Sequence, residues 1–149
     1  MVPHLPDGPT VGLANSYQAT FALLAEARDY AAIGVAADSG ALEPFDRLRL
    51  NNTAMQLTAC LASIAAWLLS QRAVEAGEIT REQGHGRQHR LAPCPLCDDA
   101  AAKTGPLPER LEILIERTLV LYRRVERLDR LLDADGASRQ PGGEPRPAL

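Results

Sequence analysis

A long apolar seam near the C-terminal end of the chain limits the possible folds more than any other feature of the sequence. Its members recur alternately four and three residues apart, which places them on one face of an α-helix. They are Leu107, Leu111, Leu114, Thr118, Leu121, Val125, Leu128 and Leu132. Pro108 and Glu109 suit the first turn of such a helix, where a missing N–H breaks no hydrogen bond and an acidic group faces the positive end of the helix dipole. The seam therefore predicts a long helix over 107–132.

The same segment carries a second apolar stripe, formed by Ile115, Leu119 and Tyr122. A helix that is apolar on two sides must be covered by more than one neighbour. A bundle of only three helices gives little cover for both faces. We therefore expect the chain to form a homodimer with a helical interface.

Two further long helices are predicted upstream. Apolar residues recur at helical spacing over 16–37, and the pair Ser39-Gly40 ends this segment. A second helix is expected to begin at Pro44 and to run to about Ala76, because Gly77 suits the residue after a helix end. Its buried seam is formed by Leu57, Leu61, Ile64 and Leu68.

The segment after this helix predicts only a short helix and a loop. Thr80 and Gln83 have the spacing of a capping box, in which each side chain satisfies a backbone N–H of the other. Gly84 and Gly86 weaken the helix that follows. Residues 92–105 are expected to form a loop.

Composition agrees with one soluble all-α domain. Of the 149 residues, 46% are hydrophobic but only 4% are aromatic, and this scarcity argues against a β-sandwich or barrel. The net charge of -3 gives no basic field, so nucleic acid is not an expected partner. We predict an antiparallel three-helix bundle with one short extra helix. The bundle is expected over 15–133, between a flexible arm at 1–14 and a disordered tail at 134–149.

A cytoplasmic location is expected from what the sequence lacks. The N-terminus has no basic region followed by an apolar run, so no signal peptide is predicted. The longest apolar run has about half the length that a bilayer requires, and no membrane partner is expected. Three cysteines do not make a disulfide framework, which favours a reducing compartment.

Two segments resemble a known family. They are LASIAAWLLSQRAVEAGEITREQ at 61–83 and LPERLEILIERTLVLYRRVERLDRLL at 107–132. Together they resemble the regulator of CtrA degradation (RcdA-like) proteins of alphaproteobacteria. The core WLLSQRAVEAGEIT is the more specific match, and its signature residues are Trp67, Gln71, Arg72, Glu75, Gly77 and Glu78.

The resemblance implies a small dimeric three-helix bundle without a catalytic site. Such proteins are cytoplasmic, and some members are located at a cell pole. They act as adaptors that help to deliver cell-cycle regulators to the ClpXP protease. The residues themselves show no G-x-S-x-G, P-loop or Rossmann pattern, so enzymatic activity is not expected.

One cluster has the spacing of a metal site. His85, His89, Cys94 and Cys97 follow the pattern H-x3-H-x4-C-x2-C, and four such side chains could hold one tetrahedral Zn²⁺. The alternative is an exposed polar loop with two incidental thiols. A redox pair of Cys94 and Cys97 is disfavoured because a βαβ context is absent. Cys60 is expected to be a small core residue.

Two hypotheses for the function follow. The first is an adaptor that brings protease-associated proteins and protein cargo together. The second is a zinc-stabilised helical module for protein interaction, unrelated to proteolysis. No other cofactor is expected. Trp67 is open to two interpretations, an anchor of an interface or ordinary core packing, and packing is favoured because its helix is apolar on most sides.

Overall fold

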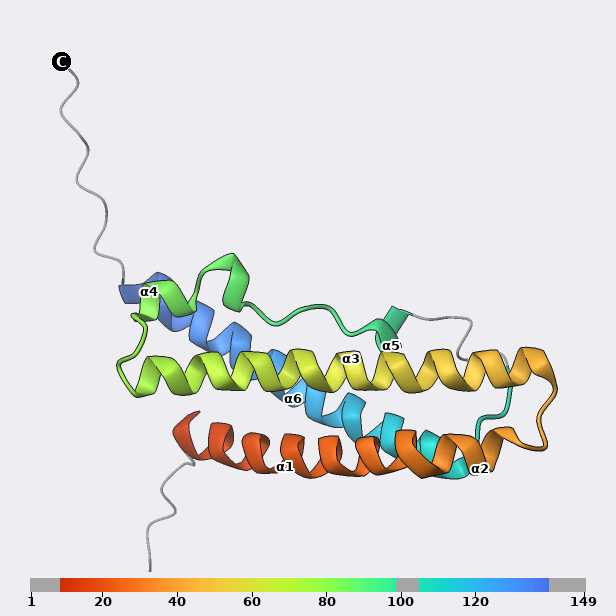
Figure 1. Cartoon of the computed structure of the whole chain (residues 1–149). Helices are drawn as coiled ribbons and strands as arrows, with labels where there is room; N and C mark the ends of the chain where they lie inside the picture. The colour runs from red at the N-terminus through yellow and green to blue at the C-terminus, as the bar shows by residue number, and fades with distance from the viewer. Residues whose placement is uncertain (1–8, 99–104, 140–149) are drawn as a thin grey trace, which may run out of the picture.

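The computed structural model describes residues 9–98 and 105–139, which form an all-α bundle of three long helices (Figure 1). The first long helix is continuous through α1 (Pro9–Asp29), a π-helical turn (Tyr30–Gly34) and α2 (Val35–Ser39). The other two are α3 (Pro44–Glu75) and α6 (Glu109–Arg139). Between them lie α4 (Arg81–Gly84), a 3₁₀ turn (Arg87–His89) and α5 (Pro95–Asp98). The predicted fold class is confirmed, although the described residues contain two short α-helices between α3 and α6 rather than one.

The prediction of antiparallel helices is correct for α1, which runs antiparallel to both α3 and α6. Arg72, near the end of α3, lies over the ring of Tyr17, near the start of α1. Glu26 of α1 pairs with Arg117 of α6. In contrast, α3 and α6 run in the same direction, because the segment between them returns along the outside of α3 before α6 begins (Figure 1). We call residues 76–98 the crossover segment.

Both predicted ends of the bundle need correction. Residues 9–14, assigned to the flexible arm, form the first turns of α1. Pro9 is compatible with a first helical turn, and Gly12 lies so close to α6 that an added Cβ would be 3.8 Å from Leu128. At the other end, α6 continues through residues 134–139, which we had assigned to the tail. A lone Gly136 does not end the helix, since a glycine costs only about 1 kcal/mol there. The remaining parts of the arm and the tail, 1–8 and 140–149, lie outside the described residues.

The core lies where the predicted seams of α3 and α6 meet. All four seam residues of α3 are buried; Leu50 extends this face toward the start of the helix, and Trp67 is buried beside Leu68 near its other end. The buried members of the α6 seam are Leu111, Leu114, Thr118, Leu121 and Val125. Thr118 is accommodated because its hydroxyl donates a hydrogen bond to the carbonyl of Leu114 at 2.7 Å. The apolar seam predicted over 107–132 is therefore the core-facing side of α6.

The second stripe of α6 is covered by the chain itself. Tyr122 is buried, and its hydroxyl donates a hydrogen bond to the carbonyl of Ala92 at 3.0 Å. Leu96 of α5 is buried in the same core. Burial, with a smaller contribution from the Glu126 carboxylate, raises the pKa of the Tyr122 phenol. The crossover segment thus covers Tyr122, and Ile115 and Leu119 are partly buried against the core, so the stripe does not by itself require a second chain.

The π-helical turn in the first long helix makes room for a tyrosine ring. Tyr30 is buried, and its ring lies so close to Gly34 that any Cβ at this glycine would collide with it. The phenol donates a hydrogen bond to Oδ2 of Asp38 at 2.9 Å. Burial, then the hydrogen bond to Asp38, raise the pKa of this phenol far above its usual value. The turn therefore anchors the end of the first long helix to the core.

Candidate protein-interaction site

The signature residues lie at the end of the bundle where α3 ends, and they have three different roles. Trp67 is 2% exposed, and its indole Nε1–H donates a hydrogen bond to Oδ1 of Asp129 at 2.8 Å. A buried indole needs such an acceptor, and here the acceptor belongs to α6. Trp67 thus fixes α3 against α6 from inside the core, which confirms the packing interpretation.

Gly77 and Glu78 end α3 through the backbone. Gly77 has a φ of +75°, and its N–H donates to the carbonyl of Val74, while the N–H of Glu78 donates to the carbonyl of Ala73. These two bonds form a Schellman motif, whose left-handed residue is normally a glycine. The predicted helix stop at Gly77 is confirmed. The side chain of Glu78 is exposed.

The remaining three signature residues line a groove between α1 and α3. The groove has a volume of about 420 Å³. Gln71, Arg72 and Glu75 form its α3 side, together with Leu68. Its α1 side is formed by Leu13, Ala14, Tyr17 and Gln18. The guanidinium carbon of Arg72 lies 4.5 Å from the centre of the Tyr17 ring. This cation–π contact holds the guanidinium in a defined place while leaving its N–H groups for a partner.

This groove combines an apolar floor with polar groups that suit a peptide. Two glutamine amides can donate to and accept from a peptide backbone, and Arg72 and Glu75 offer one charge of each sign. A protein segment offers backbone amides and charged side chains that could pair with the groups of this lining. We call this surface the α1/α3 groove.

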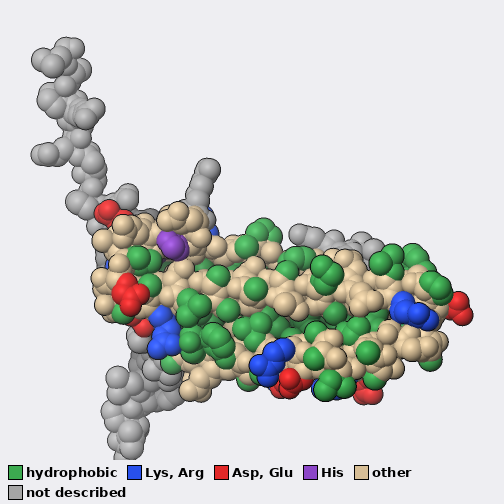
Figure 2. All heavy atoms as spheres, viewed as in Figure 1, with side chains coloured by type: hydrophobic (Ala, Val, Ile, Leu, Met, Phe, Trp, Pro, Cys, Tyr) green, Lys and Arg blue, Asp and Glu red, His purple; other side chains and the backbone are tan. Residues whose placement is uncertain are grey.

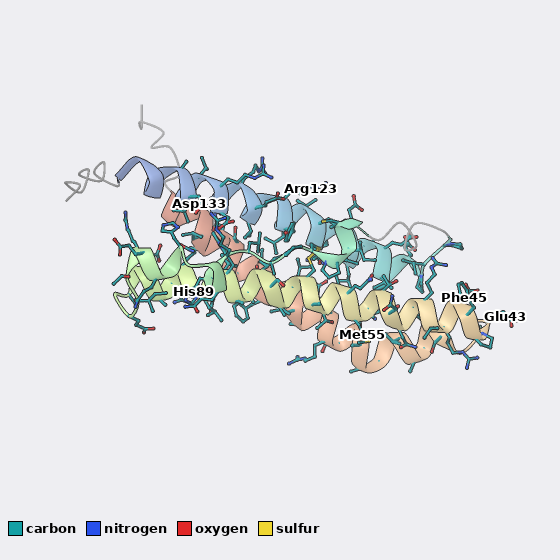
Figure 3. The ribbon with its side chains drawn as sticks, turned by 90° about the horizontal axis from the view of Figure 1, so that it is seen from above. Glu43, Phe45, Met55, His89, Arg123 and Asp133 are labelled. Carbon is teal, nitrogen blue, oxygen red and sulfur yellow. A yellow bond between two sulfur atoms is a disulfide. The ribbon has the colours of Figure 1, made fainter. Side chains whose placement is uncertain are left out.

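The crossover segment is fixed to the same end of the bundle. Thr80 and Gln83 form the predicted capping box, with hydrogen bonds of 3.1 and 2.9 Å. His85 and Arg90 both contact the carboxylate of Asp133 near the end of α6. Figure 3 shows Asp133 at this end of the molecule. These contacts order the segment that follows the signature residues.

The structure does not bring the four predicted zinc ligands together. His85 faces Asp133, His89 contacts Oγ of Ser70 at 3.0 Å, and Cys94 is bonded to Cys60. Cys97 is exposed on α5. Within 9–98 and 105–139, no group of three or more Cys, His, Asp or Glu side chains could hold a metal ion. The predicted site is not formed because α4 ends at Gly84, so the two histidines do not share a helix face.

The disulfide between Cys60 and Cys94 corrects the interpretation of the cysteines. Cys60 is buried in the core as expected, but its sulfur is bonded to Cys94, 34 residues later. The bond joins the middle of α3 to the start of α5. Cys94 therefore pairs with neither Cys97 nor a metal. The spacing of the three cysteines could not reveal this pair, because the return of the crossover segment along α3 brings the two thiols together.

Three residues of this site were not singled out from the sequence. Tyr17 was assigned to an apolar stripe, and Asp129 and Asp133 stand in a segment rich in arginine. In the helix predicted over 107–132, the two aspartates stand within or directly after the last turn, where acidic residues oppose the helix dipole, and this position is a signal that they have partners elsewhere. Their partners are the indole of Trp67 on α3 and the side chains of His85 and Arg90 in the crossover segment, and these contacts provide that reason.

The chain belongs to the family described as proteins of unknown function DUF1465, whose profile matches residues 11–148. The fold is similar to the crystal structure of RcdA from Caulobacter crescentus CB15, with a TM-score of 0.65 and 29% sequence identity. That similarity covers 80% of this chain and 89% of RcdA. The resemblance inferred from the two sequence segments is thereby confirmed. A comparison with curated proteins gives no significant match.

Proposed function

We propose that this chain is a non-enzymatic adaptor of regulated proteolysis, which helps to deliver CtrA-like cell-cycle regulators to the ClpXP protease. The similarity to RcdA, at 29% identity over 80% of the chain, carries this proposal. The name of the RcdA-like family links it to the degradation of CtrA. We extend this role to the present chain, as a cytoplasmic homodimer whose partners are protease-associated proteins and protein cargo.

Two features of the structure suit an adaptor. The α1/α3 groove offers apolar, amide and charged groups within a volume of about 420 Å³. The Trp67–Asp129 hydrogen bond joins α3 to α6 at this end of the bundle, and the contacts of Asp133 join α6 to the crossover segment. Across the groove itself, Arg72 of α3 lies over the ring of Tyr17 of α1. A rigid surface loses little conformational entropy when a partner binds, which favours affinity. Three of the signature residues of the family line this groove, and we assign it to partner binding.

The experiment is a measurement of protein half-life in the native host. Deletion of the gene should lengthen the half-life of a CtrA-like regulator or of another ClpXP substrate, and the wild-type chain should restore it. Arg72→Glu should fail to restore it, because the substitution reverses the charge that Tyr17 holds in the groove. Arg28→Glu is the matched control, since the side chain of Arg28 is 78% exposed on α1 and forms an ion pair with its neighbour Asp29 rather than with another helix.

Unchanged half-lives of CtrA-like regulators and of ClpXP substrates in the deletion strain would contradict the proposed function. Full restoration by Arg72→Glu would contradict only the assignment of the groove. Both variants should be compared at equal cellular levels, because a loss of stability can lower abundance and imitate a loss of binding.

A further inference from the structure

A second groove lies between α1 and α6, on a different side of α1 from the α1/α3 groove. Its volume is about 360 Å³, and the buried side chains of Leu23 and Leu121 form its floor. An ion pair of 2.5 Å between Arg117 and Glu26 joins the two helices beyond Leu23. The rest of the lining consists of Ala19 and Ala22 on α1 and Glu116, Arg117, Val120 and Arg124 on α6. We call it the α1/α6 groove.

The α6 side of this groove belongs to an exposed stripe in which apolar and arginine side chains are mixed. Its members alternate four and three residues apart, so they share one face of the helix. They are Ile113, Arg117, Val120, Arg124, Arg127 and Leu131, and all six are exposed. The three apolar members are between 47% and 63% exposed. Exposed apolar side chains beside an apolar groove mark an interaction surface, and the arginines among them give it a charge.

Two of these arginines have no carboxylate partner in the part of the chain that the structure describes. They are Arg124 and Arg127. On α6 itself, no acidic residue stands three or four positions from either of them. The facing helix α1 has no charged residue from Pro9 to Ala25. Arg123 and Arg124 instead stand four and three residues from Arg127, where like charges repel each other. A carboxylate supplied by a partner would relieve this repulsion.

The end of the helix does not explain these arginines. Cations are favoured in the last turn of a helix, and the effect of the helix dipole falls off beyond it. Because α6 continues to Arg139, Arg124 and Arg127 lie more than three turns before its end. Figure 3 shows Arg123, from the same run, on the side of α6 away from α3. The run therefore requires a reason other than the helix dipole.

The outer face of α3 differs from this surface in its lack of charge. In Figure 2, hydrophobic side chains lie along the middle of α3, and charged side chains lie toward its ends. No Asp, Glu, Lys or Arg occurs from Leu50 to Gln71. That face has no charge along its middle with which to select a partner, whereas the α1/α6 groove does.

We propose that the α1/α6 groove binds an acidic amphipathic helix of a partner protein. Apolar side chains of this helix enter the groove above Leu23 and Leu121, and two of its carboxylates pair with Arg124 and Arg127. The two arginines are three residues apart on α6. Carboxylates three or four residues apart on the partner helix have the same spacing of about 5–6 Å between Cβ atoms. Apolar anchors on one face of a helix, placed in a groove, are a recurrent mode of peptide recognition.

An anionic lipid surface is the alternative occupant of a stripe that carries arginines and apolar side chains. A lipid surface is contacted by side chains that protrude, whereas Leu23 and Leu121 lie between two helices at the floor of a groove. The α1 side of the groove contributes no cation, and Glu116 on the α6 side would be repelled by anionic headgroups. A protein helix can reach the floor and can place its carboxylates beside the arginines alone.

This inference goes beyond the proposed function, which assigns partner binding to the α1/α3 groove, and does not depend on it. The first test uses a fluorescein-labelled, alanine-based helical peptide of about 16 residues, with leucines on one face and glutamates beside them one turn apart. Fluorescence anisotropy should show saturable binding to the full chain. The same peptide with glutamine in place of glutamate should bind at least about tenfold more weakly. No saturable binding at up to about 500 μM chain, or equal binding of the two peptides, would overturn the proposal.

The second test places the binding site with matched variants. Arg124→Glu should weaken binding of the glutamate peptide at least about tenfold, because a like charge replaces a favourable pair. Arg28→Glu is its control, since it changes the net charge equally at a side chain that is 78% exposed and paired with Asp29. Ala22→Trp should weaken binding by filling the groove without a change of charge. Ala25→Trp is the control for this variant, because Ala25 is exposed on α1 but does not line the groove.

Far-UV circular dichroism and urea midpoints establish that the variants are folded. Unchanged affinity of either Arg124→Glu or Ala22→Trp would overturn the assignment to the groove. Flotation of the wild type, but not of Arg124→Glu, with phosphatidylglycerol vesicles and without saturable peptide binding would assign the surface to anionic lipid instead.

These outcomes are separate from those of the proposed function. Absence of peptide binding contradicts this inference alone. Unchanged half-lives in the deletion strain contradict the adaptor role alone.

Discussion

Reduction of the Cys60–Cys94 disulfide tests how much of the stability depends on fixing the crossover segment to α3. The bond joins two buried sulfurs separated by 34 residues. A cross-link stabilises the folded state mainly by restricting the unfolded chain, and the effect grows with the logarithm of the closed loop. For the 34-residue separation, the chain-entropy relation gives about 3.8 kcal/mol at 25 °C. With a urea dependence of about 2 kcal/mol per M, this corresponds to a midpoint shift of about 2 M.

The assay compares urea unfolding of the oxidised protein with and without a phosphine reductant, followed by far-UV circular dichroism. Chain concentration is kept equal, because dimerisation would itself shift the midpoint. Cys94→Ala should behave as the reduced protein does under both conditions. Cys97→Ser should respond to the reductant as the wild type does, since Cys97 is not part of this bond.

Mass spectrometry of alkylated protein establishes that the bond is present before unfolding. If the bond is present and the oxidised and reduced midpoints coincide, the loop-closure reasoning is refuted. A native-state hydrogen exchange experiment then localises the effect. Reduction should increase exchange around Leu91 and Leu96, which cover α6, more than in the seam of α3.

Three further predictions concern single side chains. Trp67→Phe should lower the free energy of unfolding by about 1.5–3 kcal/mol in urea titrations, because it leaves the Asp129 carboxylate without the indole donor; an effect no larger than that of a surface substitution would contradict this role. Gly77→Ala should lower the free energy of unfolding by about 1–2 kcal/mol in the same titrations. The whole effect should come from the backbone φ of +75°, which disfavours alanine, because an added Cβ meets nothing within 4 Å. Burial raises the pKa of Tyr30 and Tyr122 above the usual value of 10.0, so their stabilising effect is complete below about pH 10 and is lost as the pH rises toward the folded-state pKa values. Urea midpoints should therefore fall above about pH 10, and Tyr30→Phe should reduce this dependence; identical pH profiles would show that Tyr30 does not contribute to it.

The helical pattern of the sequence was sufficient to predict the three long helices and the buried faces of α3 and α6. It did not predict the buried face of the first helix, where Leu23, Ala27 and Tyr30 are buried while Phe21 is 40% exposed. The spacing of the α6 seam and of Leu57, Leu61, Ile64 and Leu68 reflects the period of the helix itself, which is a local property of the chain. The stop at Gly77 and the capping box at Thr80 were predicted for the same reason, since caps are formed by residues within one turn of the helix end. The assignment of residues 9–14 to a flexible arm was wrong because contacts with α6, as at Gly12, outweigh a local excess of proline and glycine.

The candidate site was predicted less well than the fold. Gln71, Arg72 and Glu75 were singled out by resemblance, but only the position of α1 shows that they share a groove with Tyr17. The expected zinc site depended on His85 and His89 continuing one helix, and α4 ends before it includes them. The second stripe of α6 does not by itself require a partner, because the crossover segment covers Tyr122.

By itself, the sequence determined that three long helices form, where α3 begins and ends, and which faces of α3 and α6 are buried, because all of these follow from spacings of a few residues. Only the tertiary structure decided which apolar faces are buried by other parts of the same chain. The crossover segment returns along α3, covers Tyr122 on the second stripe of α6 and brings Cys94 to Cys60. One face, on the outside of α3, is left uncovered by the described residues. Contacts between residues far apart in the chain depend on the path of the backbone, and no local spacing encodes that path.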